Sequence, residues 1–344
     1  MKDPHFSEAI LRWYAENGRD LPWRRTRDPY AIWLSEIILQ QTRIVQGTAY
    51  WERFMSRFPN VESLAEASED EVLRLWEGLG YYSRARNLHA AAKQIVTAGS
   101  FPHTIAGIRA LKGVGDYTAA AIGSIAFGLH AAVLDGNVYR VLSRYYGIAT
   151  PIGTAAAKKE FSSLAEQLLP EGKSADFNQG MMDFGAIQCT PASPGCETCP
   201  LAASCQARLS GRIPLLPVRK EQKPATVRYF TYYYFRCNGM TAFRKRPAGD
   251  IWQGLWEPYL LEFSNQKETE DLPAWIRDHS PILLRKGVRH QLTHRTLLTD
   301  FYLVDSSARP SLPDGYEWIK EEDLDRLGKP RLVEILLECL AEKR

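Results

Sequence analysis

Apolar residues recur every three or four positions from about Phe6 to Ala207, and no stretch in this region alternates apolar with polar residues. This spacing places the apolar side chains on one face of each successive helix. Residues that commonly cap helices precede several of the apolar runs and predict helix starts at Ser35-Glu36, Ser68 and Thr154. The pattern therefore predicts an all-α domain with many helices.

The pattern changes after a connector at residues 212–225, whose three prolines and mixed charges suit an extended tether. Three segments beyond it are rich in aromatic and β-branched residues, as strands are: 227–237, 241–245 and 296–304. Asn238-Gly239 separates the first two and predicts a β-hairpin. Helical spacing returns in two further segments: 272–279 and 321–341. We therefore expect a second domain of the α+β class.

The chain of 344 residues is long enough for two domains, and its 45% hydrophobic and 24% charged residues are ordinary for a globular protein. The net charge of +3 permits a polyanionic partner without requiring one. The N-terminal residues read as an amphipathic helix rather than a signal peptide. A run without acids, lysine or arginine, Thr118 to Leu134, is shorter than the ~20 residues that span a bilayer. We expect a cytoplasmic protein with no membrane partner.

A glycine hairpin, Gly113-Val114-Gly115, precedes an apolar helix that we expect over residues 116–127. Glycine lets the backbone come close to a phosphate, because no Cβ stands in the way. Asp135 follows 20 residues after Gly115, just before a basic amphipathic segment at 137–144. This order suits a site that holds a nucleic-acid backbone beside a carboxylate. In the alternative interpretation the hairpin is buried and Asp135 only caps the next helix.

Four cysteines form the pattern C-x6-C-x2-C-x5-C within a short stretch: Cys189, Cys196, Cys199 and Cys205. Thiols this close together predict a metal site, and a chain without a secretion signal is not expected to form disulfides. Zinc sites commonly use two C-x2-C pairs, whereas only one tight pair is present here. Iron–sulfur clusters accept looser spacing within a single loop. The spacing favours a [4Fe–4S] cluster and leaves zinc as the alternative.

The hairpin, the later aspartate and the cysteine loop resemble, in this order and spacing, the endonuclease III superfamily of DNA glycosylases. The resemblance covers about residues 6–210 and implies a helix–hairpin–helix glycosylase domain with an iron–sulfur loop. Four segments are most similar to the adenine DNA glycosylase family: LPWR at 21–24, SEIILQQT at 35–42, WEGLGYYSRARN at 76–87 and FNQGMMDFGAIQCT at 177–190. This closer likeness implies hydrolysis of the N-glycosidic bond of adenine mispaired with 8-oxoguanine or guanine, after base flipping.

The resemblance also implies roles for four residues near the reacting sugar. Glu36 lies in an apolar helix where burial raises a carboxyl pKa, so it serves as general acid toward adenine N7 and then as base for water. Asp135 remains ionised and stabilises the oxocarbenium-like sugar, with Asn137 as a hydrogen-bonding partner. Tyr117 occupies the position where bifunctional relatives carry a lysine nucleophile, so we expect base removal without strand cleavage. The alternative for Glu36 is an acid at a helix N-terminus that interacts with the helix dipole.

Further residues match family positions that contact DNA. The implied pocket for flipped adenine consists of Trp23, Arg24, Leu39, Gln41 and Gln179. The implied wedge that fills the gap in the duplex consists of Leu79 and Tyr81, which Gln41 and Thr42 adjoin. The backbone N–H groups of Gly113 and Gly115 are expected to bind a phosphate.

The second domain resembles the C-terminal domain of adenine DNA glycosylases, which is related to Nudix hydrolases. GLWEP at 254–258 matches a family segment with one residue missing, and the acidic metal-binding helix of active Nudix enzymes is absent. The segment 291–296 stands where the family has a Phe-Ser-His loop that recognises 8-oxoguanine. Leu292 replaces the phenylalanine and Thr293 the serine, while His294 remains. We expect Thr293 and His294 to contact the lesion.

We therefore expect a multi-domain protein: a helix–hairpin–helix glycosylase domain at 1–212 with a cluster loop at 189–205, a linker at 213–225, and an α+β Nudix-like domain at 226–344. The expected partner is double-stranded DNA with A:8-oxoguanine or A:G mispairs, bound by a nucleoid-associated monomer. One alternative is an endonuclease III-like glycosylase for oxidised pyrimidines, which Tyr117 and the second domain disfavour. Another is a non-catalytic iron–sulfur protein that binds damaged DNA, which the pair Glu36 and Asp135 disfavours.

Overall fold

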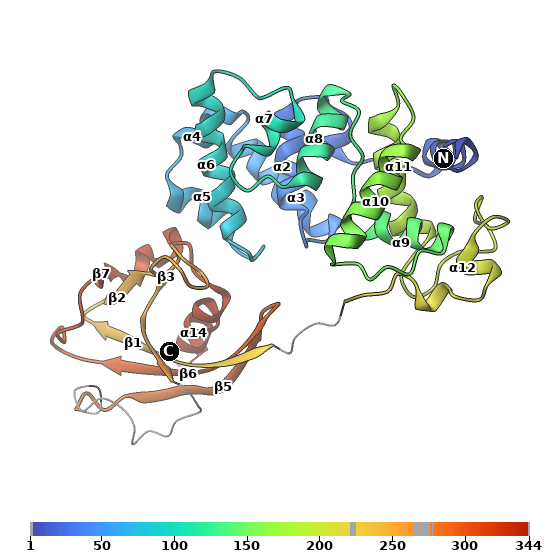
Figure 1. Cartoon of the computed structure of the whole chain (residues 1–344). Helices are drawn as coiled ribbons and strands as arrows, with labels where there is room; N and C mark the ends of the chain where they lie inside the picture. Colours follow the sequence, from blue (N-terminus) through green and yellow to red (C-terminus); the bar gives the residue numbers. More distant parts are fainter. Residues whose placement is uncertain (1–2, 221–224, 264–275, 277, 343–344) are drawn as a thin grey trace. The chain divides into compact units, whose positions relative to one another are not determined.

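The structure is a computed structural model that describes residues 3–220, 225–263, 276 and 278–342. Its contacts group the chain into two compact units (Figure 1). The first unit consists of Met1–Glu66 and Asn87–Glu221, and the second of Ala67–Arg86 and Gln222–Arg344.

The first unit is helical, as the apolar spacing predicts. Its helices are α1 (Pro4–Asn17), α2 (Pro29–Ile38), α3 (Ile44–Arg57), α4 (Val61–Glu66), α6 (Ser83–Ala98, whose first turn groups with the second unit), α7 (Ile105–Arg109), α8 (Asp116–Phe127), α9 (Gly136–Tyr146), α10 (Ala155–Leu168), α11 (Ser174–Asp183) and α12 (Gln206–Leu209). Three short turns of helix join them: η1 (Pro22–Arg24), η2 (Phe184–Gln188) and η3 (Ile213–Leu215).

Two helices that are apolar on nearly all sides, α2 and α8, form the centre of this unit. They pack against each other, and α8 also packs against α7 and α11. A helix that is hydrophobic all round is stable only when it is buried. The sequence of these two helices therefore places Glu36 and Tyr117, the ionisable residues that we assign to the site, inside the unit.

One expected helix start is wrong. Helix α2 begins at Pro29, and Asp28 caps it by accepting a hydrogen bond of 3.0 Å from the backbone N–H of Tyr30. Ser35 lies inside the helix, where its hydroxyl donates to the carbonyl oxygen of Ile32. Proline is favoured at the first helical position, because its missing N–H has no partner there in any case.

The other two expected starts are confirmed. The hydroxyl of Ser68 caps α5 (Glu69–Leu75) and that of Thr154 caps α10, and each accepts a hydrogen bond from the backbone N–H three residues later. The helix expected over residues 116–127 is α8, with the same ends. The first part of the connector is structured, because Ile152 forms a β-bridge with Arg219.

The second unit combines α5 and its following loop with a mixed sheet. The strands are β1 (Thr226–Cys237), β2 (Met240–Lys245), β3 (Trp256–Glu257), β4 (Tyr259–Phe263), β5 (Ile282–Gln291), β6 (Arg295–Asp305) and β7 (Glu317–Lys320). β1 pairs in parallel with β6 and antiparallel with β2 and β4; β2 also pairs with β3 and β7, and β6 with β5. The Asn238-Gly239 hairpin is confirmed, since Cys237 faces Met240 across the turn.

A helix, α14 (Arg331–Glu342), packs on this sheet, and its apolar residues share a core with β1 and β6. The single helix that we expect over 321–341 is in fact two, η5 (Glu321–Arg326) and α14. Pro330 explains the interruption, because it has no N–H to donate and disfavours a helical conformation at Lys329. The helix expected over 272–279 lies largely outside the described residues.

Within the described parts of the chain, no helix is both long enough and apolar enough to cross a membrane.

Candidate active site

A cavity of about 430 Å³ in the first unit collects residues from segments far apart in the sequence. Small-molecule sites have volumes of roughly 300–1,000 Å³. Nine residues that we expect around the flipped base and its sugar line this cavity, and so does Thr42, which we expect beside the wedge. The nine are Trp23, Arg24, Glu36, Leu39, Gln41, Tyr117, Asp135, Asn137 and Gln179. The two carboxylates on which the proposed chemistry depends therefore share one cavity.

Glu36 lies in the last turn of α2 with only 8% of its surface exposed. The hydroxyl of Tyr117 donates a hydrogen bond of 3.0 Å to Oε2 of Glu36. Burial raises the pKa of Glu36 to about 7, against the opposing effects of this hydrogen bond and of the Arg24 charge. The carboxyl is thus partly protonated at neutral pH. Its place at the helix C-terminus rules out the alternative of an acid at a helix N-terminus.

Tyr117 stands in the first turn of α8, and its hydroxyl also lies 3.2 Å from Sδ of Met182. Burial, together with the charges of Glu36 and Asp135, raises the pKa of Tyr117 well above its ordinary value. The phenol therefore keeps its proton at neutral pH and remains a hydrogen-bond donor to Glu36.

Asp135 is the N-cap of α9, so the capping interpretation of this residue is correct and is compatible with a place in the cavity. Its Oδ1 accepts from the backbone N–H groups of Asn137 at 2.9 Å and Val138 at 2.7 Å, and Oδ2 accepts from the Asn137 side-chain amide at 2.8 Å. Burial raises the pKa of Asp135, and these three donors act against that rise.

Asp183 supports a residue of the candidate site, Arg24, and was not predicted from the sequence. Its side chain is fully buried and accepts two hydrogen bonds from the Arg24 guanidinium, at 2.7 and 2.9 Å, and others from Arg19. Burial opposes ionisation of Asp183, but the hydrogen bonds from both arginines outweigh it and hold the pKa below its usual value. Asp183 thereby fixes Arg24 at the cavity wall. Its position inside the apolar run GMMDFGAI at 180–187 was the available signal, because a buried carboxylate requires cationic partners.

The π-helical turn η2 packs closely against the start of α9 at Gly185. A Cβ atom at Gly185 would lie 2.6 Å from Cβ of Asn137, so only glycine permits this approach. Arg140 joins the same two elements, donating 2.7 Å hydrogen bonds to the Gly185 carbonyl oxygen and to Oδ1 of Asn137. The amide that binds Asp135 is therefore held from both sides.

The glycine hairpin leaves an open backbone surface at the start of α8. Gly113 adopts a left-handed conformation with φ of +77°, and a Cβ atom there would lie 2.6 Å from Cβ of Asn87. A Cβ atom at Gly115, the N-cap of α8, would meet nothing within 4 Å. Helix N-termini present unsatisfied N–H groups and a partial positive charge, which together suit an anion.

The four loop cysteines are half-buried free thiols. Burial, with smaller contributions from Cys189, Cys205 and Cys196, raises the pKa of Cys199 to about 11, so the other three sulfurs act on it electrostatically. Nη1 of Arg144 lies 3.4 Å from Sγ of Cys189. Within the described residues, no group of three or more His, Cys, Asp or Glu side chains converges closely enough to hold a metal ion.

A second cavity, of about 720 Å³, lies within the second unit and contains the residues that we expect to read the lesion. Thr293 and His294 are exposed at its wall, and the hydroxyl groups of Thr293 and Tyr81 hydrogen-bond to each other. Tyr81 is 46% exposed, whereas Leu79 is only 8% exposed and lies mostly inside the unit. Tyr81 has the left-handed φ of +47°, which is uncommon outside glycine and concentrates at functional sites.

Comparison with known proteins gives two family matches, one in each half of the chain. Residues 34–167 match the HhH-GPD superfamily of base excision DNA repair proteins, and residues 231–339 match the NUDIX domain. The adenine DNA glycosylase of Buchnera aphidicola subsp. Acyrthosiphon pisum is 35% identical over 276 residues, which cover 79% of this chain and 77% of the relative.

Solved structures agree with these matches. A thermostable thymine-DNA glycosylase is 34% identical with a TM-score of 0.55, over 60% of this chain and 95% of that one. A trapped endonuclease III–DNA intermediate is 20% identical with a TM-score of 0.52, also over 60% of this chain and 94% of that one, and shows the fold. An endonuclease III-like helical unit, a Nudix-like unit with a mixed sheet and the likeness to the Buchnera enzyme together show that the chain belongs to the adenine DNA glycosylase family of base excision repair enzymes.

Proposed function

We propose that this enzyme hydrolyses the N-glycosidic bond of adenine opposite 8-oxoguanine or guanine, after the adenine has flipped out of the duplex into the cavity of the first unit. The observation that carries the proposal is the shared cavity of Glu36 and Asp135. The two carboxyl groups have different surroundings: Glu36 has one hydrogen-bond donor and a pKa near 7, whereas Asp135 has three donors at a helix N-terminus. Different surroundings divide the roles of acid and anion between two carboxyl groups.

Glu36 is the general acid in this mechanism. The Tyr117 hydroxyl donates to Oε2, which leaves Oε1 to carry the proton toward adenine N7. Protonation makes adenine a better leaving group, and the sugar gains positive charge as the bond breaks. Glu36 is then a carboxylate and accepts a proton from the attacking water.

Asp135 is the anion beside the developing sugar cation. Three N–H donors hold its carboxylate in one orientation without neutralising it, and one of them comes from the Asn137 side chain. A preorganised charge of this kind lowers the barrier, because no group has to reorient during the reaction.

The cavity also has features that suit adenine. Oε1 of Gln179 is buried and has no hydrogen-bond partner among the described residues, so it is available to the exocyclic amino group of adenine. Arg24 is fixed at the wall by Asp183, and Trp23 packs edge-on against Trp51. Leu39 and Gln41 complete the pocket that we propose.

No lysine is among the described residues that line the cavity. Strand cleavage by a bifunctional glycosylase requires an amine that attacks the sugar. Tyr117 has no such amine, so we infer a monofunctional enzyme that leaves an abasic site in an intact strand.

Contacts with the rest of the duplex follow from the surfaces described above. We propose that the N–H groups at Gly113 and Gly115 bind a phosphate. We also propose that Thr42 and Gln41 lie near the gap that the flipped adenine leaves in the base stack. Tyr81 is the better candidate for the wedge, because Leu79 is largely buried.

We propose that Thr293 and His294 read the opposite base. 8-Oxoguanine carries an N7–H donor and a C8 oxygen acceptor, which guanine lacks. A hydroxyl group can accept the first, and a histidine N–H can donate to the second.

We further propose that Cys189, Cys196, Cys199 and Cys205 hold a [4Fe–4S] cluster. Four half-buried free thiols within one loop fit such a cluster, since thiolates are its usual ligands and metal binding removes their protons. The cluster would supply structure to the loop at 189–205, and none of the steps above passes through it. We also propose domain limits at 1–212 and 226–344. We propose further that the enzyme is a monomer and that it associates with the nucleoid in the cytoplasm.

The test is incubation of the enzyme with duplexes that contain A:8-oxoguanine, A:G, T:G or an oxidised pyrimidine. Alkali then converts abasic sites to breaks. We expect breaks at adenine in the first two duplexes, after alkali only. Release of thymine or of the oxidised pyrimidine instead of adenine, or breaks without alkali, contradicts the proposal.

A further inference from the structure

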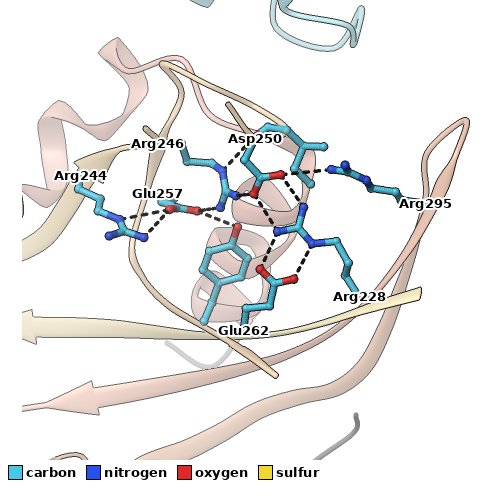
Figure 2. Close-up of polar contacts among 9 residues, drawn as sticks. Arg228, Arg244, Arg246, Asp250, Glu257, Glu262 and Arg295 are labelled. Carbon is cyan, nitrogen blue, oxygen red and sulfur yellow. Dashed lines mark hydrogen bonds and ion pairs between the residues drawn. The ribbon is translucent and has the colours of Figure 1, made fainter. Parts of the chain in front are cut away.

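A network of alternating guanidinium and carboxylate groups crosses one face of the sheet in the second unit (Figure 2). Its members come from the strands and from the loop between β2 and β3: Arg228, Arg244, Arg246, Asp250, Glu257, Glu262 and Arg295. Only two of them, Asp250 and Arg295, also line the 720 Å³ cavity. The network therefore reaches from the interior of the unit to the cavity that we assign to the lesion.

The inner part of the network is a structural anchor centred on Glu257. This carboxylate is fully buried, and it accepts hydrogen bonds from Arg246 at 2.5 Å, Tyr232 at 3.2 Å and Arg244 at 3.3 Å. A buried carboxylate is tolerated only when its partners satisfy it in this way. Arg246 thereby has a fixed position, and its other Nη donates to Asp250 at 2.6 Å.

The outer part of the network is different, because Asp250 is 29% exposed and Arg295 is 40% exposed. Ion pairs with this much solvent contact add little to stability. The 3.2 Å pair of Asp250 and Arg295 is of this kind, so stability alone does not account for it. Asp250 also binds the more buried Arg228 and Arg246, each at 2.6 Å.

The geometry of the strands explains why Asp250 is needed at this point. In the parallel pair of β1 and β6, Thr226 faces Arg295, and Arg228 is two residues further along β1 on the same face of the sheet. The guanidinium groups of Arg228 and Arg295 are thus neighbours of like charge. Figure 2 shows Asp250 between them.

Arg295 is also the first residue after the turn that carries Thr293 and His294. The turn is closed by a hydrogen bond of 2.8 Å from Leu292 N–H to the Arg295 carbonyl oxygen, and Thr226 N–H binds the His294 carbonyl oxygen at 3.1 Å. Arg295 is therefore bonded to the turn through its backbone and to Asp250 through its side chain, and it links the two.

We propose that Asp250 is a positioning residue for lesion recognition: it holds Arg295, and through Arg295 it sets Thr293 and His294 against the cavity. This inference rests on the proposed function, since it assumes that the 292–294 turn reads the opposite base. In this proposal Asp250 acts through Arg295 rather than by its own contact with the lesion. Its effect is on the preference for 8-oxoguanine over guanine.

The test compares Asp250→Asn in the full-length, cluster-loaded enzyme with a matched control, Glu262→Gln. Both carboxylates pair with Arg228 at 2.6 Å, but Glu262 does not line the cavity or contact Arg295. The measured quantity is the ratio of kcat/KM for A:8-oxoguanine to that for A:G. We expect Asp250→Asn to lower this ratio about tenfold, chiefly through KM for the 8-oxoguanine duplex. Glu262→Gln is expected to keep it within about twofold.

A second variant, Arg295→Gln, keeps the test decisive if Asp250→Asn folds poorly, because Arg295 is a partly exposed residue at the end of a strand. It is expected to lower the ratio to a similar extent, and the double variant is expected to add little, since both act through one contact. A ratio that stays unchanged in Asp250→Asn and Arg295→Gln, or falls equally in Glu262→Gln, overturns the inference.

Thr293→Ala separates this outcome from a failure of the proposed function. If Thr293→Ala lowers the ratio while Asp250→Asn and Arg295→Gln do not, the turn reads the lesion and only the positioning role of Asp250 is wrong. If Thr293→Ala leaves the ratio unchanged, the reading role of the turn is wrong and the inference about Asp250 falls with it.

Discussion

The hydroxyl of Tyr117, at the start of α8, donates a 3.0 Å hydrogen bond to Oε2 of Glu36, at the end of α2. This bond joins the two central helices of the first unit at the cavity. It favours the ionised form of Glu36, against the burial that favours the protonated form. The acid strength of Glu36 therefore depends on a residue of the other helix.

Tyr117→Phe removes this donor and is expected to raise the pKa of Glu36 further above 7. A hydrogen bond to a charged group is worth roughly 1.5–3 kcal/mol, so the rise is about one pKa unit or more. The measurement is the pH dependence of single-turnover adenine release. The alkaline limb of the profile is expected to move to higher pH, with a lower maximum because Glu36 is less well oriented. An unmoved limb in Tyr117→Phe argues against Glu36 as the titrating acid.

Glu36→Gln keeps the shape of the side chain but transfers no proton. We expect adenine release to fall by about 10²–10⁴-fold, the usual contribution of general acid–base catalysis. Binding to an A:8-oxoguanine duplex, measured by gel mobility shift, is expected to remain close to that of the wild type. Glu62→Gln, on the surface of α4, is the matched control. Turnover like that of the wild type in Glu36→Gln removes this residue from its role.

The same substitution has an expected effect on stability that depends on pH. The pKa of Glu36 is about 7 in the folded enzyme, against a reference value of 4.5, so the folded state binds more protons between these values. The contribution of Glu36 to the free energy of unfolding is therefore fully present below about pH 4.5. It is lost as the pH rises through 7, and the loss is on the order of 3 kcal/mol.

The glutamine in Glu36→Gln does not titrate, so this variant does not lose stability as the pH rises. We expect its melting temperature to exceed that of the wild type at pH 8, with a smaller difference at pH 5. Thermal unfolding followed by circular dichroism at the two pH values measures this difference, and an equal difference at both would contradict the raised pKa.

Tyr117→Lys places an amine at the cavity wall, where the hydroxyl now lies and where we expect the sugar to bind. We expect this variant to nick some of its product strands and to form covalent adducts that borohydride traps, because a lysine amine attacks the sugar carbon to give a Schiff base. Denaturing gels detect both products. Lys112 of the wild type is the internal control, since it is a hairpin lysine that does not line the cavity. The absence of adducts in Tyr117→Lys would mean that the sugar does not lie against residue 117.

Gly185→Ala tests the contact between η2 and α9. The new Cβ would lie 2.6 Å from Cβ of Asn137, so the start of α9 must shift, and Asp135 with it. We expect kcat to fall at least tenfold with a smaller change in DNA binding, because even a shift of about 1 Å is costly to catalysis. Gly136→Ala is the control, since a Cβ atom there meets nothing within 4 Å. Equal rates in both variants would show that this contact does not position Asp135.

Local patterns were sufficient for much of this fold. The ends of α8 were predictable because Gly115 and Gly128 stand at its two caps, and the Asn238-Gly239 turn was predictable because the hairpin requires those residues. The start of α2 was not predictable, because the dipeptide Asp28-Pro29 can either interrupt a helix or begin one.

In the two candidate sites, some residues could not be predicted from the sequence for a different reason. Residues inside recognisable segments, such as Glu36 and Asn137, were found, and the cavity brings them together. Asp183 was missed because its importance depends on Arg24, 159 residues away in the sequence. The bond between Tyr81 and Thr293 and the ion pairs of Asp250 are likewise tertiary contacts, and no local spacing of residues encodes them.

The two roles that we assign to Asp135, as the N-cap of α9 and as an anion in the cavity, restrict which residues can replace it during evolution. Asparagine would still begin α9 but would carry no charge, whereas glutamate would keep the charge on a side chain too long to cap the helix well. A lineage that gave up excision but kept its architecture would thus drift toward asparagine at this position. Among homologues, the residue at position 135 would then distinguish those that still excise the base from those that only bind DNA.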